Sequence, residues 1–111
     1  ELLCYPMLAI GGAGFISATA NVEPVKVAEL YNAWEAGDVA RSQDLHFELM
    51  NLNDVLFKDT NPGPVKVALG MMGKINPKLR LPLGFPSEQL VNEVRETLID
   101  LGKLPKEATV K

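Results

Sequence analysis

The sequence predicts an α/β fold: the last strand and helix of a larger barrel, followed by a helical extension that makes this chain itself mostly α. One run, residues 15–20 (FISATA), is short, uncharged and rich in small residues, which suits a strand buried on both faces. Every later apolar pattern has helical spacing. Because a single strand cannot pair its own edges, it needs neighbouring strands from a larger sheet.

Composition excludes several classes of protein. The chain has 111 residues, 47% of them hydrophobic, and a net charge of −3, which allows a packed core. Lysine and arginine are scattered singly, so no basic stripe for nucleic acid is expected. No apolar run reaches the roughly 18 residues of a membrane span. The single Cys4 cannot form an internal disulfide, which favours a reducing, cytoplasmic setting.

The start of the sequence indicates a segment that continues from upstream, whereas its end has the composition of a frayed terminus. It begins at Glu1 without an initiator methionine or the basic start of a signal peptide, so it reads as the continuation of an upstream segment. A short helical piece is expected within residues 2–10. Residues 104–111 are expected to form a frayed terminus.

The first long helix is predicted to follow the strand. Pro24 suits a first helical turn, with Asn21 or Glu23 as the preceding cap, and Gly37 ends the helix. Its apolar stripe recurs at i, i+3, i+4 and i+7, through Val27, Leu30, Tyr31 and Trp34.

A second helix is predicted from a cap at Asp38 to about Lys58, on the order of 30 Å long. One face carries leucines, at Leu45, Leu49, Leu52 and Leu56. Further apolar residues lie off that stripe, at Met50, Val55 and Phe57. A helix with two apolar faces is expected between neighbouring elements or at a subunit interface.

Two shorter helices complete the predicted order. Residues 61–64 (NPGP) form a loop, and a short apolar helix at residues 65–72 ends at Gly73. After a proline-rich crossing, the last helix begins at a Ser87 cap and ends at Gly102. Its expected buried stripe is Val91, Val94, Leu98 and Leu101.

The glycine-rich residues 11–14 (GGAG) could let backbone amides approach a phosphate. Their spacing matches neither common phosphate-binding pattern, and they precede the strand where such motifs follow one. A tight turn into the strand is the favoured interpretation.

Few side chains suggest chemistry by themselves. His46 forms no ligand face with Asp44 or Glu48, so a helix-surface histidine and no metal site are expected. Cys4 has no cation near it in sequence and is expected to be an inert thiol. Lys66 lies between valines, but its aliphatic stem can cover apolar surface with the ammonium in water, so it is not assigned as an imine-forming lysine.

Three motifs together resemble the dihydrodipicolinate synthase family. Residues 11–22 (GGAGFISATANV) resemble that family's eighth barrel strand, GG-x-G-x-IS-x-TAN. Residues 61–66 (NPGPVK) are similar to its NP-x-PVK segment, and residues 79–83 (LRLPL) to its LRLP crossing. Their order and spacing fit, and the resemblance covers nearly the whole chain.

The resemblance implies a TIM (β/α)₈ barrel with a C-terminal helical domain. Residues 1–37 would end the barrel, and residues 38–111 would form the helical domain. The family implies a class I aldolase, a lyase that binds pyruvate as a Schiff base on a lysine of the sixth strand. The enamine then attacks aspartate semialdehyde, giving 4-hydroxy-tetrahydrodipicolinate for diaminopimelate and lysine biosynthesis. No cofactor, a cytoplasmic location and a homotetramer are also implied.

Only one functional position carries over to this chain. The Schiff-base lysine and the catalytic tyrosines of the family lie upstream, and neither Tyr5 nor Tyr31 matches them by position. Lys66 belongs to the NPGPVK motif instead. Ile16 is the exception, since its counterpart borders bound pyruvate. The chain alone is therefore expected to be inactive, and the rest of the barrel is its expected partner.

Two alternatives remain open. The chain could be a self-contained helical oligomerisation module whose first strand adds to a partner's sheet. It could also belong to a sister aldolase, such as N-acetylneuraminate lyase or a keto-deoxy sugar acid aldolase, with the same fold and imine. The Thr-Ala-Asn sequence at residues 19–21 favours the synthase branch.

Overall fold

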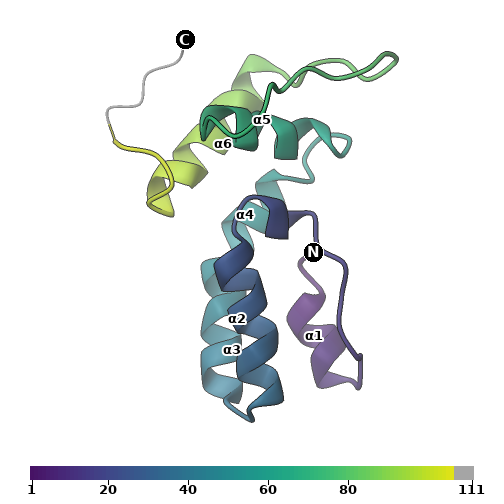
Figure 1. Ribbon diagram of the computed structural model, residues 1–111, viewed down its shortest axis with the longest axis vertical. Coiled ribbons are helices and arrows are strands. Elements are labelled where there is room, and N and C mark those ends of the chain that lie inside the picture. Colours follow the sequence, from purple (N-terminus) through teal and green to yellow (C-terminus); the bar gives the residue numbers. More distant parts are fainter. Residues whose placement is uncertain (107–111) are drawn as a thin grey trace. The chain divides into compact units, whose positions relative to one another are not determined.

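The computed structural model describes residues 1–106 and divides into two compact units, Glu1–Asp54 and Val55–Lys111 (Figure 1). Residues 107–111, part of the expected frayed terminus, lie outside the described residues. Between residues 1 and 106 all regular structure is helical, as expected for a mostly α chain. The predicted barrel boundary between residues 37 and 38 concerns strands that these residues do not include, and it stays a prediction.

A short helix opens the first unit and ends at the glycines. Helix α1 spans Cys4–Ala9, within the predicted residues 2–10. Gly11 has a φ of 100°, its N–H donates to the Leu8 carbonyl over 3.2 Å, and the Gly12 N–H donates to the Met7 carbonyl over 2.7 Å. These two bonds form a Schellman motif, which satisfies the last carbonyls of the helix. The glycine-rich run is therefore a tight turn at a helix C-terminus, where the partial negative charge disfavours phosphate.

The strand predicted at residues 15–20 is wrong for this chain. Residues 12–17 are extended but pair with no other segment in the described part of the chain. The chain then turns into a 3₁₀ helix, η1, at Thr19–Asn21. A strand needs a ladder of hydrogen bonds to a neighbouring strand, and residues 1–106 offer none. Around residue 18 the chain forms the local hydrogen bonds of a turn in place of a strand ladder.

Two helices form the hairpin of the first unit. Helix α2 spans Pro24–Glu35 and helix α3 spans Val39–Glu48, with a turn at Gly37 whose φ is 81°. Pro24 lies in the first turn as predicted; Glu23 is the cap residue but makes no side-chain cap bond. The Asp38 carboxylate does cap α3, accepting from the Arg41 N–H over 3.1 Å.

The facing sides of this hairpin bury the predicted stripes only in part. Val27 and Leu30 are buried on α2, whereas Tyr31 and Trp34 are half-buried. Buried Ser42 donates its hydroxyl to the Leu30 carbonyl over 2.8 Å, which ties α3 to α2.

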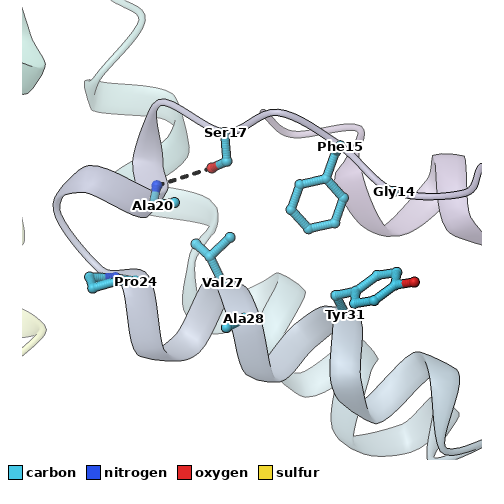
Figure 2. Close-up of a pocket in the computed structure, with 8 residues that line it drawn as sticks. All are labelled: Gly14, Phe15, Ser17, Ala20, Pro24, Val27, Ala28 and Tyr31. Carbon is cyan, nitrogen blue, oxygen red and sulfur yellow. Dashed lines mark hydrogen bonds between the residues drawn. The ribbon is translucent and has the colours of Figure 1, made fainter.

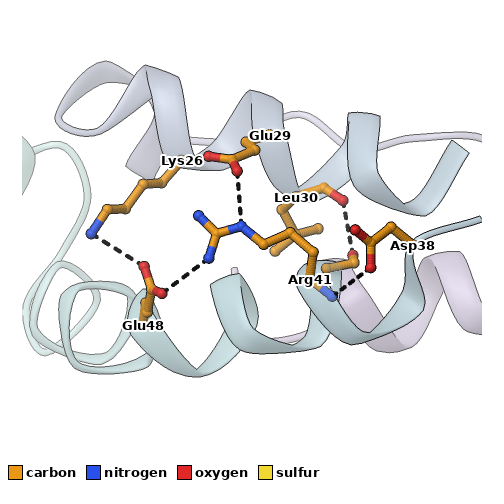
Figure 3. A network of polar contacts seen from close by, with 7 residues as sticks. Lys26, Glu29, Leu30, Asp38, Arg41 and Glu48 are labelled. Atoms are coloured by element: carbon orange, nitrogen blue, oxygen red, sulfur yellow. Dashed lines mark hydrogen bonds and ion pairs between the residues drawn. The ribbon is translucent and has the colours of Figure 1, made fainter. Parts of the chain in front are cut away.

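An ion-pair network adds to this contact at the surface (Figure 3). The Arg41 guanidinium reaches Glu29 of α2 at 2.9 Å and Glu48 of its own helix at 3.4 Å. Lys26 of α2 reaches Glu48 at 3.3 Å. Because all these side chains are partly exposed, each pair contributes at most about 1 kcal/mol.

The single helix predicted from Asp38 to Lys58 is wrong in its continuity. Helix α4, Met50–Val55, follows α3 after one intervening residue, Leu49. The predicted leucine face is nevertheless confirmed, because all four leucines at 45, 49, 52 and 56 are buried. Val55 is buried off that face, and Phe57 is exposed, so the second apolar face is only partly covered.

The second unit contains helices α5 and α6. Helix α5 spans Gly63–Met71, and Gly73 follows it with a φ of 72°. The Cβ of an alanine at Gly70 would come within 3.0 Å of the Pro77 ring, so the proline-rich crossing packs directly on α5. Lys58 binds Glu93 of α6 over 2.6 Å.

Helix α6 spans Glu88–Asp100 and begins as predicted, with the Ser87 hydroxyl accepting from the Leu90 N–H over 3.2 Å. Its buried residues are Leu90, Val94 and Leu98. The predicted stripe is thus wrong at its ends, since Val91 and Leu101 are only half-buried. Leu90 and Val91 are both apolar, so the sequence pattern fits a buried stripe that begins at either residue. The packing of α6 against α5 decides that Leu90 is the buried one.

Candidate functional site

The candidate site is built on the extended segment at residues 12–17, which carries Ile16. Figure 1 shows the chain turning back alongside α1 after the glycine turn, towards the N-terminal residue. At its far end the segment meets the carboxylate of Glu1. Ser17 donates its hydroxyl to Glu1 Oε2 over 2.9 Å, the Thr19 N–H donates to Oε1 over 3.4 Å, and the Ala18 N–H donates to the same oxygen.

Ser17 extends this arrangement into the following turn. Its hydroxyl oxygen accepts from the Ala20 N–H over 3.0 Å, the dashed contact in Figure 2. The Asn21 amide group donates to the Ala18 carbonyl over 3.0 Å. One carboxylate and one hydroxyl therefore organise the backbone of η1.

Ile16 points away from the rest of the first unit. Its relative exposure is 103%, the highest of the large apolar side chains in the described residues. Successive side chains of an extended segment face opposite sides, and both neighbours, Phe15 and Ser17, lie on the side of α2 (Figure 2). The structure thus presents Ile16 as a bare apolar side chain beside a fixed turn.

On the other side of the segment lies an apolar groove of about 350 Å³. The extended segment forms one wall and α2 the other (Figure 2). Its polar side chains are limited to two hydroxyls, those of Ser17 and Tyr31. The lining residues are Gly14, Phe15, Ser17, Ala20, Pro24, Val27, Ala28 and Tyr31.

Cys4 lies beside the Glu1 carboxylate, with its sulfur 3.7 Å from Oε2. Burial, and secondly the negative charge of Glu1, raise the pKa of the Cys4 thiol to about 11. The thiol is therefore protonated at neutral pH, which agrees with the predicted inert cysteine.

His46 joins an aromatic cluster instead of a metal site. Its ring lies 5.5 Å from the ring of Tyr5 and 5.2 Å from that of Phe47, and it is half-buried. It also lines a small cavity of about 10 Å³ with Asn53, whose buried Oδ1 has no hydrogen-bond partner. Residues 1–106 contain no group of side chains suited to a metal ion.

Lys66 is placed as the sequence indicated. It lies on α5, and its ammonium donates to the backbone carbonyl of Lys78. Because Lys66 is half-buried and its ammonium is engaged with a backbone carbonyl, an imine with a ketone is not favoured at this position.

Nothing in the sequence indicated the role of Glu1. Its contacts join residues 16 to 18 positions apart, and such pairing leaves no local pattern. Ser17 had a weak signal, since a serine three residues before Ala20 has the spacing of a cap.

Comparisons with known proteins agree on one family. The sequence model of the Dihydrodipicolinate synthetase family matches residues 1–101. The 4-hydroxy-tetrahydrodipicolinate synthase of Thermodesulfovibrio yellowstonii is 49% identical over 96 residues, covering 86% of this chain and 33% of that protein. That of Methanopyrus kandleri is 45% identical over 104 residues, covering 94% of this chain and 35% of that protein.

Solved structures give the same result. The dihydrodipicolinate synthase of Thermotoga maritima superposes with a TM-score of 0.91 at 40% identity, over 93% of this chain and 35% of that one. The enzyme of Aquifex aeolicus gives a TM-score of 0.88 at 42% identity, over 91% of this chain and 34% of that one. The chain thus spans about a third of the length of the relatives it matches.

Proposed function

The chain belongs to the dihydrodipicolinate synthetase family, and from this premise we propose that it is the C-terminal portion of a 4-hydroxy-tetrahydrodipicolinate synthase. The observation that carries the proposal is the family match over residues 1–101, with relatives of that name at 45–49% identity. The complete enzyme is proposed to be a lyase that condenses pyruvate with aspartate semialdehyde.

The proposed chemistry begins with an imine. A lysine amine outside this chain attacks the pyruvate ketone, and water leaves. Loss of a methyl proton gives an enamine, whose carbon attacks the aldehyde of aspartate semialdehyde. The amino group of the semialdehyde portion then attacks the resulting imine carbon, which closes the ring and releases the lysine amine. In this scheme the present chain holds no catalytic group.

Ile16 is proposed to border the bound pyruvate. Barrel enzymes bind substrates at the carboxyl ends of their strands, and Ile16 stands at the end of the extended segment, just before η1. An apolar side chain excludes water from the imine and restricts the orientation of the small substrate. Its full exposure in this unit is consistent with a side chain whose partners lie elsewhere.

The rest of the barrel is the proposed partner of the first unit. The apolar groove beside Phe15 supports this, because nothing in this chain fills it. So do α1 and its two cap residues, where Leu3, Met7 and Ile10 are exposed at i, i+4 and i+7. Such a stripe favours burial against further protein.

Other features of the complete enzyme are also proposals. No helix among residues 1–106 is long and apolar enough to cross a membrane. We propose a cytoplasmic enzyme that is active without a cofactor and assembles as a homotetramer, and the family match supports this proposal.

A substrate panel tests the proposal. The full-length protein is given pyruvate with aspartate semialdehyde, and separately N-acetylneuraminate or a keto-deoxy sugar acid for cleavage. The synthase is expected to turn over the first pair at a kcat/KM at least about a hundredfold above the others. Preferential cleavage of a sugar acid would assign the chain to a sister aldolase. Turnover by residues 1–111 alone would show that the catalytic group lies in this chain.

A further inference from the structure

The extended segment that carries Ile16 is anchored at both ends by α1 and the residue before it. At the near end, the Gly12 N–H is bound to the Met7 carbonyl over 2.7 Å. At the far end, Ser17, Ala18 and Thr19 all donate to the carboxylate of Glu1. Between these points residues 13–16 have no ladder of hydrogen bonds within the described chain. Within this chain, Glu1 is thus the residue that fixes the turn directly after Ile16.

We propose that Glu1 is a positioning residue for the substrate site: its carboxylate fixes the turn at residues 17–19 and thereby holds Ile16 against bound pyruvate. This inference rests on the proposed function. Glu1 touches no substrate in the proposal and acts through the backbone of the turn.

Both oxygens of the Glu1 carboxylate accept hydrogen bonds from the turn. Two backbone N–H groups and one hydroxyl converge on Glu1, and hydrogen bonds to a charged acceptor are the stronger kind. The two N–H groups belong to Ala18, the residue before η1, and to Thr19, its first residue. The Ser17 hydroxyl is held from two sides, since it donates to Glu1 and accepts from the Ala20 N–H.

The geometry transmits any loss of this contact to Ile16 directly. Ile16 is the residue before Ser17, and its side chain leaves the backbone on the side opposite to the groove. No side-chain contact within the first unit holds it, because it is fully exposed there. A shift of the Ser17 backbone therefore moves the Ile16 side chain with it. Misplacement by about 1 Å can cost up to about a hundredfold in rate.

The test uses the full-length protein with four single substitutions, of which Ser17→Ala is also combined with Glu1→Gln. Glu1→Gln keeps the shape but removes the charge and places an NH₂ donor where the Ser17 hydroxyl now donates. Glu1→Asp keeps the charge on a shorter arm. The matched control is Glu35→Gln, at the exposed end of α2. Pyruvate KM, kcat and thermal unfolding are measured for each.

We expect Glu1→Gln to raise the KM for pyruvate about tenfold, with Glu1→Asp recovering part of the loss and Glu35→Gln unchanged. The KM for aspartate semialdehyde should change much less, which a general loss of folding would not reproduce. Ser17→Ala should raise the pyruvate KM too, and the double variant with Glu1→Gln should show less than the sum of both effects. If Glu1→Gln does not fold, Ser17→Ala and Glu1→Asp carry the test.

A local readout separates the anchor from the activity. Alkylation of Cys4, followed by peptide mass against pH, reports the nearby carboxylate, so its midpoint should fall in Glu1→Gln. A lowered midpoint together with wild-type pyruvate KM would overturn the proposal, because the carboxylate would be in place without effect on the site. A wild-type protein that does not bind pyruvate would overturn the proposed function, and this proposal with it.

Discussion

The ring of Tyr5 on α1 meets the ring of Trp34 on α2 edge to face, with centroids 5.8 Å apart and planes at 88°. Helix α1 has six residues and cannot be stable by itself. Leu8 is the buried residue of α1. Because α1 buries so little else, the aromatic contact of Tyr5 with Trp34 is a main attachment of this helix to the hairpin. The anchors of the Ile16 segment are both on or beside α1 and depend on the same attachment.

Replacing Tyr5 by alanine should therefore destabilise the protein by about 2–4 kcal/mol, since the edge-to-face pair and the contact with His46 are both lost. Thermal unfolding monitored by Trp34 fluorescence measures the change. Tyr5→Phe keeps the ring and is the control, with an expected change below about 0.5 kcal/mol. Equal losses in both variants would mean that the hydroxyl, and not the ring, holds α1.

Gly12 should tolerate no side chain. The Cβ of alanine there would lie 2.7 Å from the Met7 carbonyl oxygen, a backbone atom that cannot move without opening the turn. Gly12→Ala is expected to cost about 2 kcal/mol or more, from strain and the weakened bond between these two residues. Gly84→Ala is the matched control, because nothing lies within 4 Å of its Cβ. Denaturant midpoints compare the two, and a tolerated Gly12→Ala would rule out the close approach.

Cys4 should be slow to react with iodoacetamide at pH 8. Because burial and the charge of Glu1 raise its pKa to about 11, the midpoint of alkylation against pH should lie near 11 and not near 9.0. The folded state holds the proton more tightly than the unfolded state. Its contribution to stability is thus fully present below pH 9 and is lost as pH rises from about 9 to about 11. A midpoint near 9 in the native protein would place Cys4 in water, away from Glu1.

Much of the fold could be predicted because helix signals are local. Pro24, Asp38 and Ser87 mark the starts of three helices at the expected places, and Gly73 and Gly102 follow two helix ends with positive φ. Each of these signals depends on neighbours within four residues.

The predictions that were wrong depend on contacts between residues that are far apart in the sequence. The strand at residues 15–20 requires a partner strand that residues 1–106 do not include, so its composition alone misled. The break at Leu49 has no glycine or proline to announce it. The choice of Leu90 over Val91 depends on packing against another helix, as the contacts of Glu1 depend on a segment 16 to 18 residues away. Such long-range choices leave no periodic pattern in the sequence.

Trapping pyruvate on the full-length protein tests the central claim most directly. The protein is incubated with pyruvate, reduced with borohydride, digested, and its peptides are weighed. The account predicts one reduced pyruvyl adduct, on a lysine outside residues 1–111, and no adduct without pyruvate. An adduct on Lys66 or another lysine of this chain, or no adduct at all, would contradict it.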